Sequence, residues 1–363
     1  MYRLVQRRGI IGLFCLLFVA SSVVPGWAQK DNRFEVSKNL DIFNSLLKEV
    51  EMFYVDSVDV DKTVQRGIEA MLAGLDPYTE YYPEQKTEEL SLMTTGEYGG
   101  IGSLIRQRNN EGGVMIAEPT EGMPADLAGL KPGDLILAID TIDVSKATNS
   151  RVSELLKGVP NTKMVLTIQR PGEKKPRKFE ITRKQITTPQ VTYYGVKNDS
   201  IGYIYLKAFT IKSAQEVKEA FLDLKKNHNI KSLVLDLRGN GGGVLEGAVQ
   251  IVGMFVPKGS EVLSTKGKIK QWDRTYRTST EPLDTVMPLA ILINGGTASA
   301  AEIVSGSLQD MDRAVLVGQR SFGKGLVQAP RDLPYNGKVK ITMSKYYIPV
   351  SYTQLTLPTN SLV

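Results

Sequence analysis

The chain has 363 residues, a length at which two or three folded domains are expected rather than one core. Hydrophobic residues at 42% and charged residues at 23% are typical of globular proteins, which excludes wholesale disorder. The formal net charge is +6, but residues 1–28 hold three arginines and no acid, so the rest carries +3 and gives no argument for a nucleic-acid partner.

Residues 1–28 are predicted to be an export signal. Their arginines precede an apolar run from Ile10 to about Val24, which is followed by small residues and a plausible cleavage site after Ala28. The run is shorter than the roughly 20 apolar residues that span a bilayer comfortably, which favours cleavage. An uncleaved signal that holds the chain at a membrane is the alternative.

Scarce residue types restrict the chemistry. The sequence contains one cysteine, Cys15, which lies inside the apolar run, and one histidine, His228. The mature chain is therefore expected to lack a thiol nucleophile, a disulfide framework and a usual zinc site, and no metal or organic cofactor is expected. His228 lies between an amphipathic stretch and a strand-like run, which indicates a surface residue at a helix end rather than a catalytic base.

Residues 29–95 are predicted to form a helical segment. Between residues 36 and 73, apolar residues recur at spacings of three and four, which indicates two helices. A turn-rich aromatic stretch, LDPYTEYYP, follows at residues 75–83, and its tyrosines are interpreted as packing residues.

Residues 96–185 change to short strand-like runs separated by turns, with short helices at MPADLAGL and SRVSELLKG. This pattern predicts a compact β-rich module. Its basic stretch EKKPRK, residues 173–178, is interpreted as a solvated hairpin turn, because no aromatic pattern for base stacking accompanies it.

Residues 186–350 alternate apolar strands with helical stretches, which predicts an α/β domain with a mainly parallel sheet covered on both faces by helices. The active site of such a sheet is expected at the carboxyl ends of its strands. The runs LVQAPRDLP and KVKITMSKYYIP predict an antiparallel extension. Residues 351–363 carry no charge and break this pattern, which indicates a truncated or foreign tail.

The segment ILINGGTASAAEIVSGSLQD places Ser299 where an apolar strand, a glycine turn and a helix meet. Free N–H groups and the positive dipole end at a helix start would stabilise the oxyanion of a tetrahedral intermediate, so Ser299 is the candidate nucleophile. Taken alone, an ordinary helix N-cap explains the pattern better.

The segment VGQRSFGKGLVQ supplies a candidate base, Lys324, between two glycines. Burial has to lower the pKa of this lysine by about three units, roughly 4 kcal/mol, before its amine can accept a proton from Ser299 at neutral pH. Gln328, four residues on, is a candidate to orient the amine through its amide. A lysine that faces water or binds anions in a glycine-rich loop is the alternative.

The segment SLVLDLRGNGGG predicts a buried strand followed by a glycine-rich turn. N–H groups in such a turn can hold an oxyanion, and Gly242 and Ala300 are the candidate donors. Nucleotide binding is the competing interpretation, although neither a GxGxxG nor a P-loop spacing is present. Asp236 and Arg238 are expected to hold the strand end together.

Together these segments resemble the C-terminal processing, or tail-specific, peptidases, a family of serine peptidases with a Ser-Lys dyad and a PDZ domain. The resemblance extends to about Pro349 and is carried by LDPYTEYY, GGIG, LKPGDLILAID, LDLRGNGGG, NGGTASAAEIVSGSLQD and VGQRSFGKGLVQ. It implies a crotonase-like hydrolase domain in which Ser299 is the nucleophile, Lys324 the base and Gln328 its orienting partner.

The resemblance also places Gly242 and Ala300 near the oxyanion. Here the turn reads RGNGGG where the family usually has a sequence like RNNPGG, which leaves the exact donor open. The family usually continues beyond Tyr347 into further sheet and helix, whereas this chain passes into its atypical tail.

For residues 96–185 the resemblance implies a PDZ domain that binds substrate C-termini by strand addition, with the carboxylate accepted around Gly100, Ile101 and Gly102. The expected partners are proteins or peptides with free C-termini, and the expected location is the periplasm or cell envelope of a bacterium. The hypothesis is a secreted serine endopeptidase. A PDZ-containing binding scaffold with an inactive hydrolase-like domain is the alternative, and the oligomeric state is not predicted.

Overall fold

The computed structural model describes residues 33–108 and 112–349. The predicted export signal, residues 1–28, and the atypical tail, residues 351–363, lie outside the described residues. The chain divides into two compact units, Met1–Ala70 and Met71–Val363.

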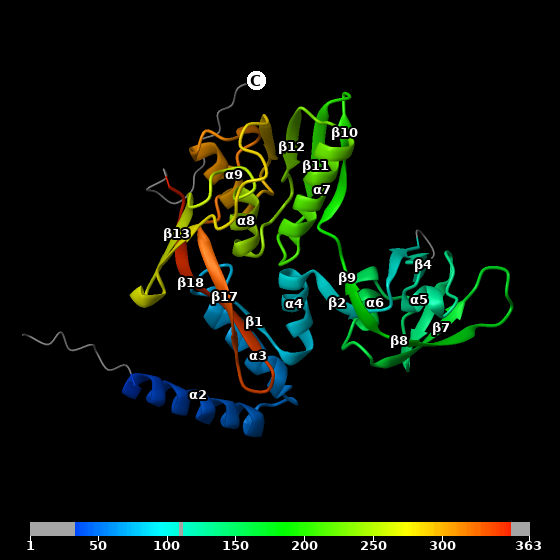
Figure 1. Cartoon of the computed structure of the whole chain (residues 1–363). Coiled ribbons are helices and arrows are strands. Elements are labelled where there is room, and N and C mark those ends of the chain that lie inside the picture. Colours follow the sequence, from blue (N-terminus) through cyan, green and yellow to red (C-terminus); the bar gives the residue numbers. More distant parts are fainter. Residues whose placement is uncertain (1–32, 109–111, 350–363) are drawn as a thin grey trace, which may run out of the picture. The chain divides into compact units, whose positions relative to one another are not determined.

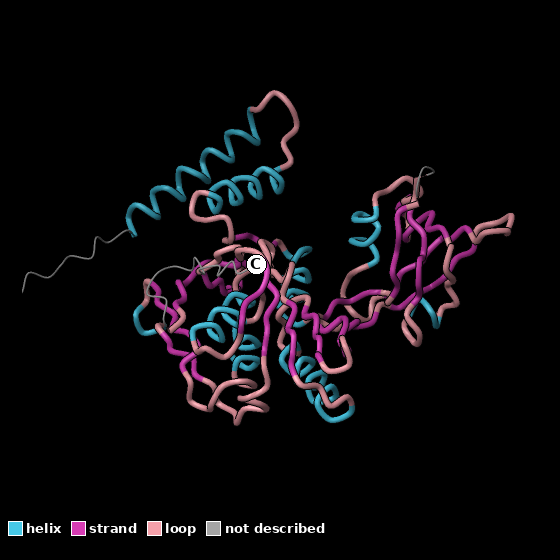
Figure 2. Tube along the Cα trace, turned by 90° about the horizontal axis from the view of Figure 1, so that it is seen from above, coloured by secondary structure: helices cyan, strands magenta, loops and turns pink. Residues whose placement is uncertain are grey.

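Two helices follow one another at the start of the described chain, as the apolar spacing predicts. They are α2 (Arg33–Phe53) and α3 (Val60–Ala73), and a loop joins them (Figure 2). None of the helices in the described part of the chain combines the length and the apolar character needed to span a bilayer.

The β-rich module is an antiparallel sheet with the strand order β3-β4-β5-β7-β8, in which β6 pairs with β5. A two-stranded ribbon of β2 and β9 lies at its chain ends. Its core is built from the alternate, fully buried residues of the strands, among them Ile116, Ile136 and Leu166. Its helices and strands are β2 (Glu97–Gly100), β3 (Ser103–Gln107), β4 (Val114–Pro119), α5 (Pro124–Leu127), β5 (Leu135–Ile139), β6 (Ile142–Asp143), α6 (Asn149–Leu156), β7 (Lys163–Gln169), β8 (Arg177–Thr182) and β9 (Lys184–Thr187).

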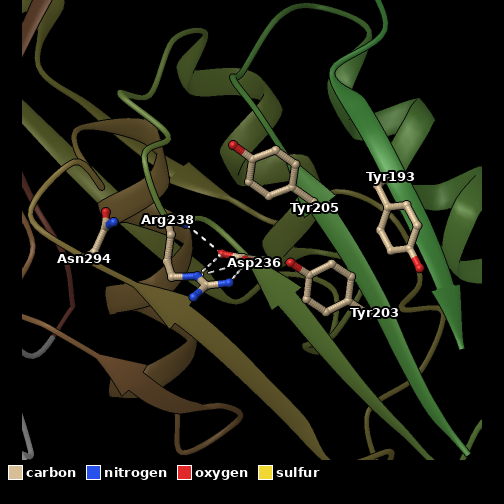
Figure 3. Close-up of a pocket in the computed structure, with 6 residues that line it drawn as sticks. All are labelled: Tyr193, Tyr203, Tyr205, Asp236, Arg238 and Asn294. Carbon is tan, nitrogen blue, oxygen red and sulfur yellow. Dashed lines mark hydrogen bonds and ion pairs between the residues drawn. The ribbon is translucent and has the colours of Figure 1, made fainter. Parts of the chain in front are cut away.

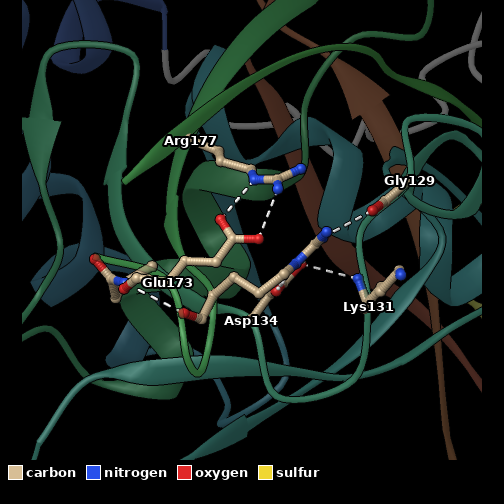
Figure 4. Close-up of polar contacts among 7 residues, drawn as sticks. Gly129, Lys131, Asp134, Glu173 and Arg177 are labelled. Atoms are coloured by element: carbon tan, nitrogen blue, oxygen red, sulfur yellow. Dashed lines mark hydrogen bonds and ion pairs between the residues drawn. The ribbon is translucent and has the colours of Figure 1, made fainter. Parts of the chain in front are cut away.

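Two ion pairs involve residues at the turn between β7 and β8 (Figure 4). The fully buried carboxylate of Asp134 accepts hydrogen bonds from Nε and Nη2 of Arg170, both at 2.8 Å. In the basic turn, Arg177 forms an ion pair with Glu173 at 2.6 Å and is about half exposed. The interpretation of EKKPRK as a solvated turn is therefore confirmed.

The α/β domain contains a five-stranded sheet with the order β10-β11-β12-β15-β16. The first pair is antiparallel and the other three pairs are parallel, as predicted. Helix α7 lies along β10 and β11 (Figure 1). The helices and strands are β10 (Val191–Lys197), β11 (Ile201–Leu206), α7 (Ser213–Asn227), β12 (Ser232–Asp236), α8 (Leu245–Val252), β15 (Leu289–Ile293), α9 (Ala300–Asp310) and β16 (Val315–Gly318).

Within the described residues, this sheet is fully buried on one face only, which corrects the expectation of helices on both faces. Ile204, Leu235 and Ile291 are completely buried, whereas most of their strand neighbours on the opposite face, such as Tyr203, Val234 and Ala290, are only partly buried. Val315 and Val317 of the edge strand β16 are 67% and 48% exposed. The apolar strand runs misled the prediction because the outward face carries Tyr, Val, Ala and Leu, and composition alone does not distinguish this from a two-sided core.

An antiparallel sheet packs into the same core as the parallel one. Its strands β17 and β18 form the predicted hairpin, and β18 also pairs with β1 and β13. Tyr346 and Ile348 from the end of this hairpin belong to the same buried cluster as the strands of the parallel sheet. The elements of this region are β1 (Glu80–Tyr82), a 3-10 turn (Glu84–Lys86), α4 (Thr87–Thr95), β13 (Glu261–Gly267), a 3-10 turn (Lys270–Trp272), β14 (Arg274–Arg277), β17 (Leu326–Asp332) and β18 (Lys338–Tyr347).

Candidate active site

Two glycine-rich turns meet at the carboxyl ends of β12 and β15. The side-chain oxygen of Asn294 accepts the N–H groups of Gly239 at 2.9 Å and Gly296 at 3.0 Å. The hydroxyl of Thr297 donates to the carbonyl of Leu237 at 2.8 Å. These bonds fix the two turns against each other, in the place where a parallel sheet is expected to carry its site.

Ser299 caps helix α9 in a backbone conformation that L-residues rarely adopt. Its φ is 55° and its ψ is −117°. Such a conformation costs about 1–3 kcal/mol and persists only where surrounding contacts enforce it. One of these contacts is the bond from the Ser299 N–H to Oε2 of Glu302, at 2.8 Å.

Gly242 and Ala300 both lie next to Ser299. A Cβ atom on Gly242 would be 2.8 Å from the Ser299 Cβ and 2.9 Å from the Ala300 nitrogen, so only glycine fits this approach. The Gly242 N–H donates to Oδ1 of Asn240 at 2.9 Å, whereas the Ala300 N–H has no hydrogen-bond partner in the part of the chain that the structure describes. Ala300 therefore offers a free donor, and the oxyanion role of Gly242 stays a prediction.

The Lys324 backbone is bonded on both sides. Its N–H donates to Oε2 of Glu302 at 2.9 Å, and its carbonyl accepts the hydroxyl of Tyr346 at 2.6 Å. The same hydroxyl lies 3.3 Å from the Ser299 carbonyl. Burial raises the pKa of Tyr346 well above its usual range, so the hydroxyl stays protonated and donates. The loop of Lys324 is thereby anchored beside the start of α9.

The Lys324 amine lies over the face of Tyr78, with Nζ 4.2 Å from the ring centroid. Burial lowers the pKa of this amine, and the positive charge of Lys340 lowers it further, against the opposing effect of Glu80, Asp76 and Glu302. This is the direction that a general base requires. Within the described residues no hydrogen bond joins the Lys324 amine to the Ser299 hydroxyl.

Gln328 lies on β17, and its amide donates to the hydroxyl of Thr342 at 3.0 Å rather than to Lys324. Thr342 in turn bonds through its N–H to the hydroxyl of Thr79, at 3.1 Å. Gln328 therefore connects β17 to the residues that follow the LDPY turn. Its assignment as the partner of Lys324 stays a prediction.

Sequence reasoning missed Glu302, although it is fully buried and joins the two candidate catalytic segments. Besides Ser299 and Lys324, its carboxylate accepts the Ser321 hydroxyl and the Gly323 N–H, each at 2.6 Å. The signal was present, because a Ser followed by Glu three residues later is the spacing of a helix capping box. The contact between Tyr78 and Lys324 was also not predicted, because the tyrosines of the LDPYTEYYP stretch were interpreted as packing residues.

Asp236 and Arg238 stabilise the end of β12, as predicted (Figure 3). Arg238 donates to both oxygens of the buried Asp236 carboxylate, with the shortest bond at 2.6 Å, and the Tyr203 hydroxyl donates to it at 2.6 Å. These side chains line a pocket of about 510 Å³ together with Tyr193, Tyr205 and Asn294. Neither Ser299 nor Lys324 lines this pocket. The pocket is therefore separate from the candidate dyad.

His228 lies at the end of α7 and pairs with Asp223 at 3.8 Å, with its side chain 51% exposed. The prediction of a surface helix-end residue is confirmed. Over residues 33–108 and 112–349, no cluster of three or more histidine, cysteine or acidic side chains is arranged to bind a metal ion.

In the β-rich module, Gly100, Ile101 and Gly102 lie together along one groove. They line a small pocket with residues of β3 and α6. The structure therefore brings the three residues of the expected carboxylate site into one cavity.

Comparison with known proteins identifies both parts of the chain. Residues 200–356 match peptidase family S41, and residues 115–170 match the PDZ domain. A carboxy-terminal-processing protease of Bartonella bacilliformis is 35% identical over 337 residues, which cover 92% of this chain and 75% of that protein. The chain belongs to the carboxy-terminal-processing proteases of peptidase family S41.

Further members are similar to this carboxy-terminal-processing protease. The carboxyl-terminal-processing protease of Synechocystis is 35% identical over 287 residues, which cover 78% of this chain and 66% of that protein. The solved photosystem II D1 C-terminal processing protease is 30% identical to this chain. The match covers 84% of this chain and 82% of the solved one, with a TM-score of 0.45. The resemblance noted in the sequence, and the PDZ domain it implies, are confirmed.

Proposed function

We propose that this S41 protease is an exported endopeptidase that binds protein C-terminal tails through its PDZ domain and cuts peptide bonds with Ser299 and Lys324. The export part is supported by the arginines and apolar run of residues 1–28. The chain spans 75% and 66% of the two relatives compared above, and tail recognition is therefore proposed for this chain and not carried over from them.

One observation supports the dyad above all others: a single carboxylate oxygen, Oε2 of Glu302, accepts the N–H groups of both Ser299 and Lys324. Because both N–H groups bond to this one oxygen, the backbones of Ser299 and Lys324 are held close enough for their side chains to meet. The lowered pKa of the Lys324 amine supports the same assignment, because a neutral amine can accept a proton.

In the reaction, the Ser299 oxygen attacks the substrate carbonyl carbon while its proton passes to the neutral Lys324 amine. The tetrahedral oxyanion is stabilised by the Ala300 N–H and the positive end of α9. As the C–N bond breaks, Lys324 returns the proton to the leaving amine. Water then attacks the acyl-enzyme and gives one proton to Lys324. As the ester C–O bond to Ser299 breaks, Lys324 passes this proton to the serine oxygen, and the new C-terminus is released.

The decisive experiment incubates the mature chain with an unfolded protein that has an apolar C-terminus. Cleavage is expected from the wild type and is expected to be lost in both Ser299→Ala and Lys324→Ala, with melting temperatures measured to confirm folding. Cleavage that survives in both variants would refute the dyad. Fractionation of producing cells, with N-terminal sequencing of the protein, tests export and cleavage near residue 28.

A binding scaffold is the second candidate function, and one observation favours it. The Lys324 amine contacts the Tyr78 ring and not the Ser299 hydroxyl. Catalysis requires the amine to leave the ring and approach the hydroxyl, which the rotatable methylene chain of lysine permits. Peptide binding without any cleavage by the wild type would favour the scaffold.

A further inference from the structure

The aromatic ring of Tyr78 lies against the amine of Lys324, and the function proposed above gives this ring no role. The Lys324 Nζ is 4.2 Å from the ring centroid, and within the described residues no hydrogen bond joins the amine to the Ser299 hydroxyl. We propose that Tyr78 is a positioning residue whose ring holds the protonated Lys324 amine away from Ser299 until the amine loses its proton. This inference rests on the proposed function, since it takes Lys324 as the base.

The turn that carries Tyr78 holds its backbone in place. Oδ1 of Asp76 accepts the N–H groups of Tyr78 and Thr79, both at 2.8 Å, and Oδ2 accepts the Thr79 hydroxyl at 2.8 Å. An aspartate that bonds to backbone N–H groups a few residues ahead of it fixes a tight turn. Pro77 restricts the same backbone further. The point from which the Tyr78 side chain extends is therefore set by local bonds.

The turn and the lysine are both attached to strand β18. Thr79 is buried, and its hydroxyl accepts the N–H of Thr342 at 3.1 Å. Further along the strand, the Tyr346 hydroxyl donates to the Lys324 carbonyl at 2.6 Å. Because both backbones are bonded to one strand, the contact between the ring and the amine is built into the fold. The methylene chain of Lys324 can break this contact without any movement of the backbone.

The attraction of the ring for the amine depends on the charge of the amine. Lys338 and Lys340 of β18 each pair with an acid, whereas the Lys324 amine forms no ion pair with any described residue. An aromatic face attracts a cation through its quadrupole, and it has little attraction for a neutral amine. The protonated amine is therefore held on the Tyr78 ring, and the neutral amine is free to turn toward Ser299.

Four charged side chains act on this amine from the surrounding elements. Burial and the positive charge of Lys340 favour its neutral form, whereas the carboxylates of Glu80, Asp76 and Glu302 favour the charged form. Replacement of the Tyr78 ring leaves all four of these side chains in place. A change in the titration of Lys324 in such a variant is therefore due to the ring.

The test compares Tyr78→Leu with the wild type by measuring kcat/KM against pH for an unfolded protein with an apolar C-terminus. Leucine keeps an apolar side chain beside the amine but does not attract its charge. The rise in rate is expected to move to lower pH by about 0.4 to 1.5 pH units, the range of a cation–π contact. Below the wild-type midpoint, Tyr78→Leu is therefore expected to cleave about 2- to 30-fold faster. A purely structural role for Tyr78 would instead lower the rate at every pH and leave the rise at the same pH.

Two variants serve as controls. Tyr78→Phe keeps the ring and is expected to keep the rise at the wild-type pH. Tyr81→Leu makes the same change in the same segment, at a tyrosine that lies against Gly337 rather than Lys324, and is expected to leave the rise unmoved. Melting temperatures of all variants confirm that they are folded.

Titration of the Lys324 amine separates this inference from the proposed function. It is followed by NMR of isotope-labelled lysine in the full chain, and the Lys324 signal is identified by its loss in Lys324→Arg. The pKa of this amine is expected to be lower in Tyr78→Leu than in the wild type. An unmoved pKa, or a rise in rate at the same pH in both proteins, would overturn the role of Tyr78 and leave the dyad standing. A wild type that cleaves nothing, with the pKa moved as expected, would instead overturn the proposed function and leave the ring contact standing.

Discussion

Ser299 and Lys324 donate their backbone N–H groups to the same oxygen atom, Oε2 of Glu302, at 2.8 and 2.9 Å. Ser299 caps helix α9, whereas Lys324 lies in the loop between β16 of the parallel sheet and β17 of the antiparallel sheet. Glu302 is buried and takes no part in the proposed reaction, yet it fixes the separation of Ser299 and Lys324.

Glu302→Gln is expected to lower both stability and turnover. The amide nitrogen that replaces one oxygen faces N–H donors, and each unpaired buried donor costs about 1–3 kcal/mol. Because the change acts on the position of the dyad and not on tail binding, kcat is expected to fall while KM changes little. Urea unfolding and steady-state cleavage measure the two effects. A Gln variant with wild-type stability and kcat would contradict the role assigned to Glu302.

The pH profile of cleavage is expected to depend on Lys340. The reaction needs the neutral amine of Lys324, so the rate rises as pH increases through the pKa of that group. Burial and then the charge of Lys340 lower this pKa, which places the rise below the range of an ordinary lysine. Lys340→Met removes the second effect, and it also frees Glu80, which Lys340 pairs with, to favour the charged amine.

The rise in rate is therefore expected to move to higher pH in Lys340→Met. The matched control is Lys338→Met on the same strand, whose lysine pairs with the exposed Asp332 and is absent from the causes of the Lys324 shift. The measurement is kcat/KM against pH for the three proteins. Identical profiles would show that Lys340 does not tune the base.

Gly242→Ala is expected to abolish most of the activity. Gly242 has a φ of 94°, and an added Cβ would lie 2.7 Å from the Ala298 carbonyl oxygen and 2.8 Å from the Ser299 Cβ. The nucleophile has to shift, and a displacement of about 1 Å can reduce a rate about 100-fold. Gly241→Ala is the control, because its Cβ would have no atom within 4 Å. Equal losses in the two variants would contradict this steric explanation.

Arg238→Met is expected to destabilise the α/β domain, most clearly above pH 4. Although burial acts to raise it, bonds from Arg238 and Tyr203 hold the pKa of Asp236 below its usual value. A carboxyl with a lowered pKa stabilises the fold above its unfolded pKa of about 3.9, and this contribution is lost as pH falls through the folded value. Loss of bonds to the charged group is expected to cost about 1.5–3 kcal/mol at neutral pH.

Thermal unfolding at neutral and acidic pH measures this effect. Tyr203→Phe, which removes one hydroxyl from the same carboxylate, is expected to cost less. A wild-type melting temperature for Arg238→Met at neutral pH would contradict the prediction.

Local patterns predicted the order of elements and the places of Ser299 and Lys324, because strands, glycine turns and helix starts are written in short stretches of sequence. They failed where distant segments meet. Thr79 contacts Thr342 across 263 positions, and Thr342 also accepts the Gln328 amide, a pair of contacts that local patterns do not predict. The burial of Glu302 follows from the packing of α9, and the exposed face of the parallel sheet has an apolar composition that local patterns assign to a core.

Lys324 is anchored twice, by Glu302 at its N–H and by Tyr346 at its carbonyl. These two bonds restrict the motion of its backbone. The two peptide groups that flank the Lys324 Cα cannot move away from Ser299 without breaking bonds to buried groups. In the proposed mechanism, the Lys324 amine therefore reaches the Ser299 hydroxyl by a change of side-chain rotamer, in which it leaves the Tyr78 ring. Any ligand that displaces the Tyr78 ring is expected to change the rate of the proposed reaction.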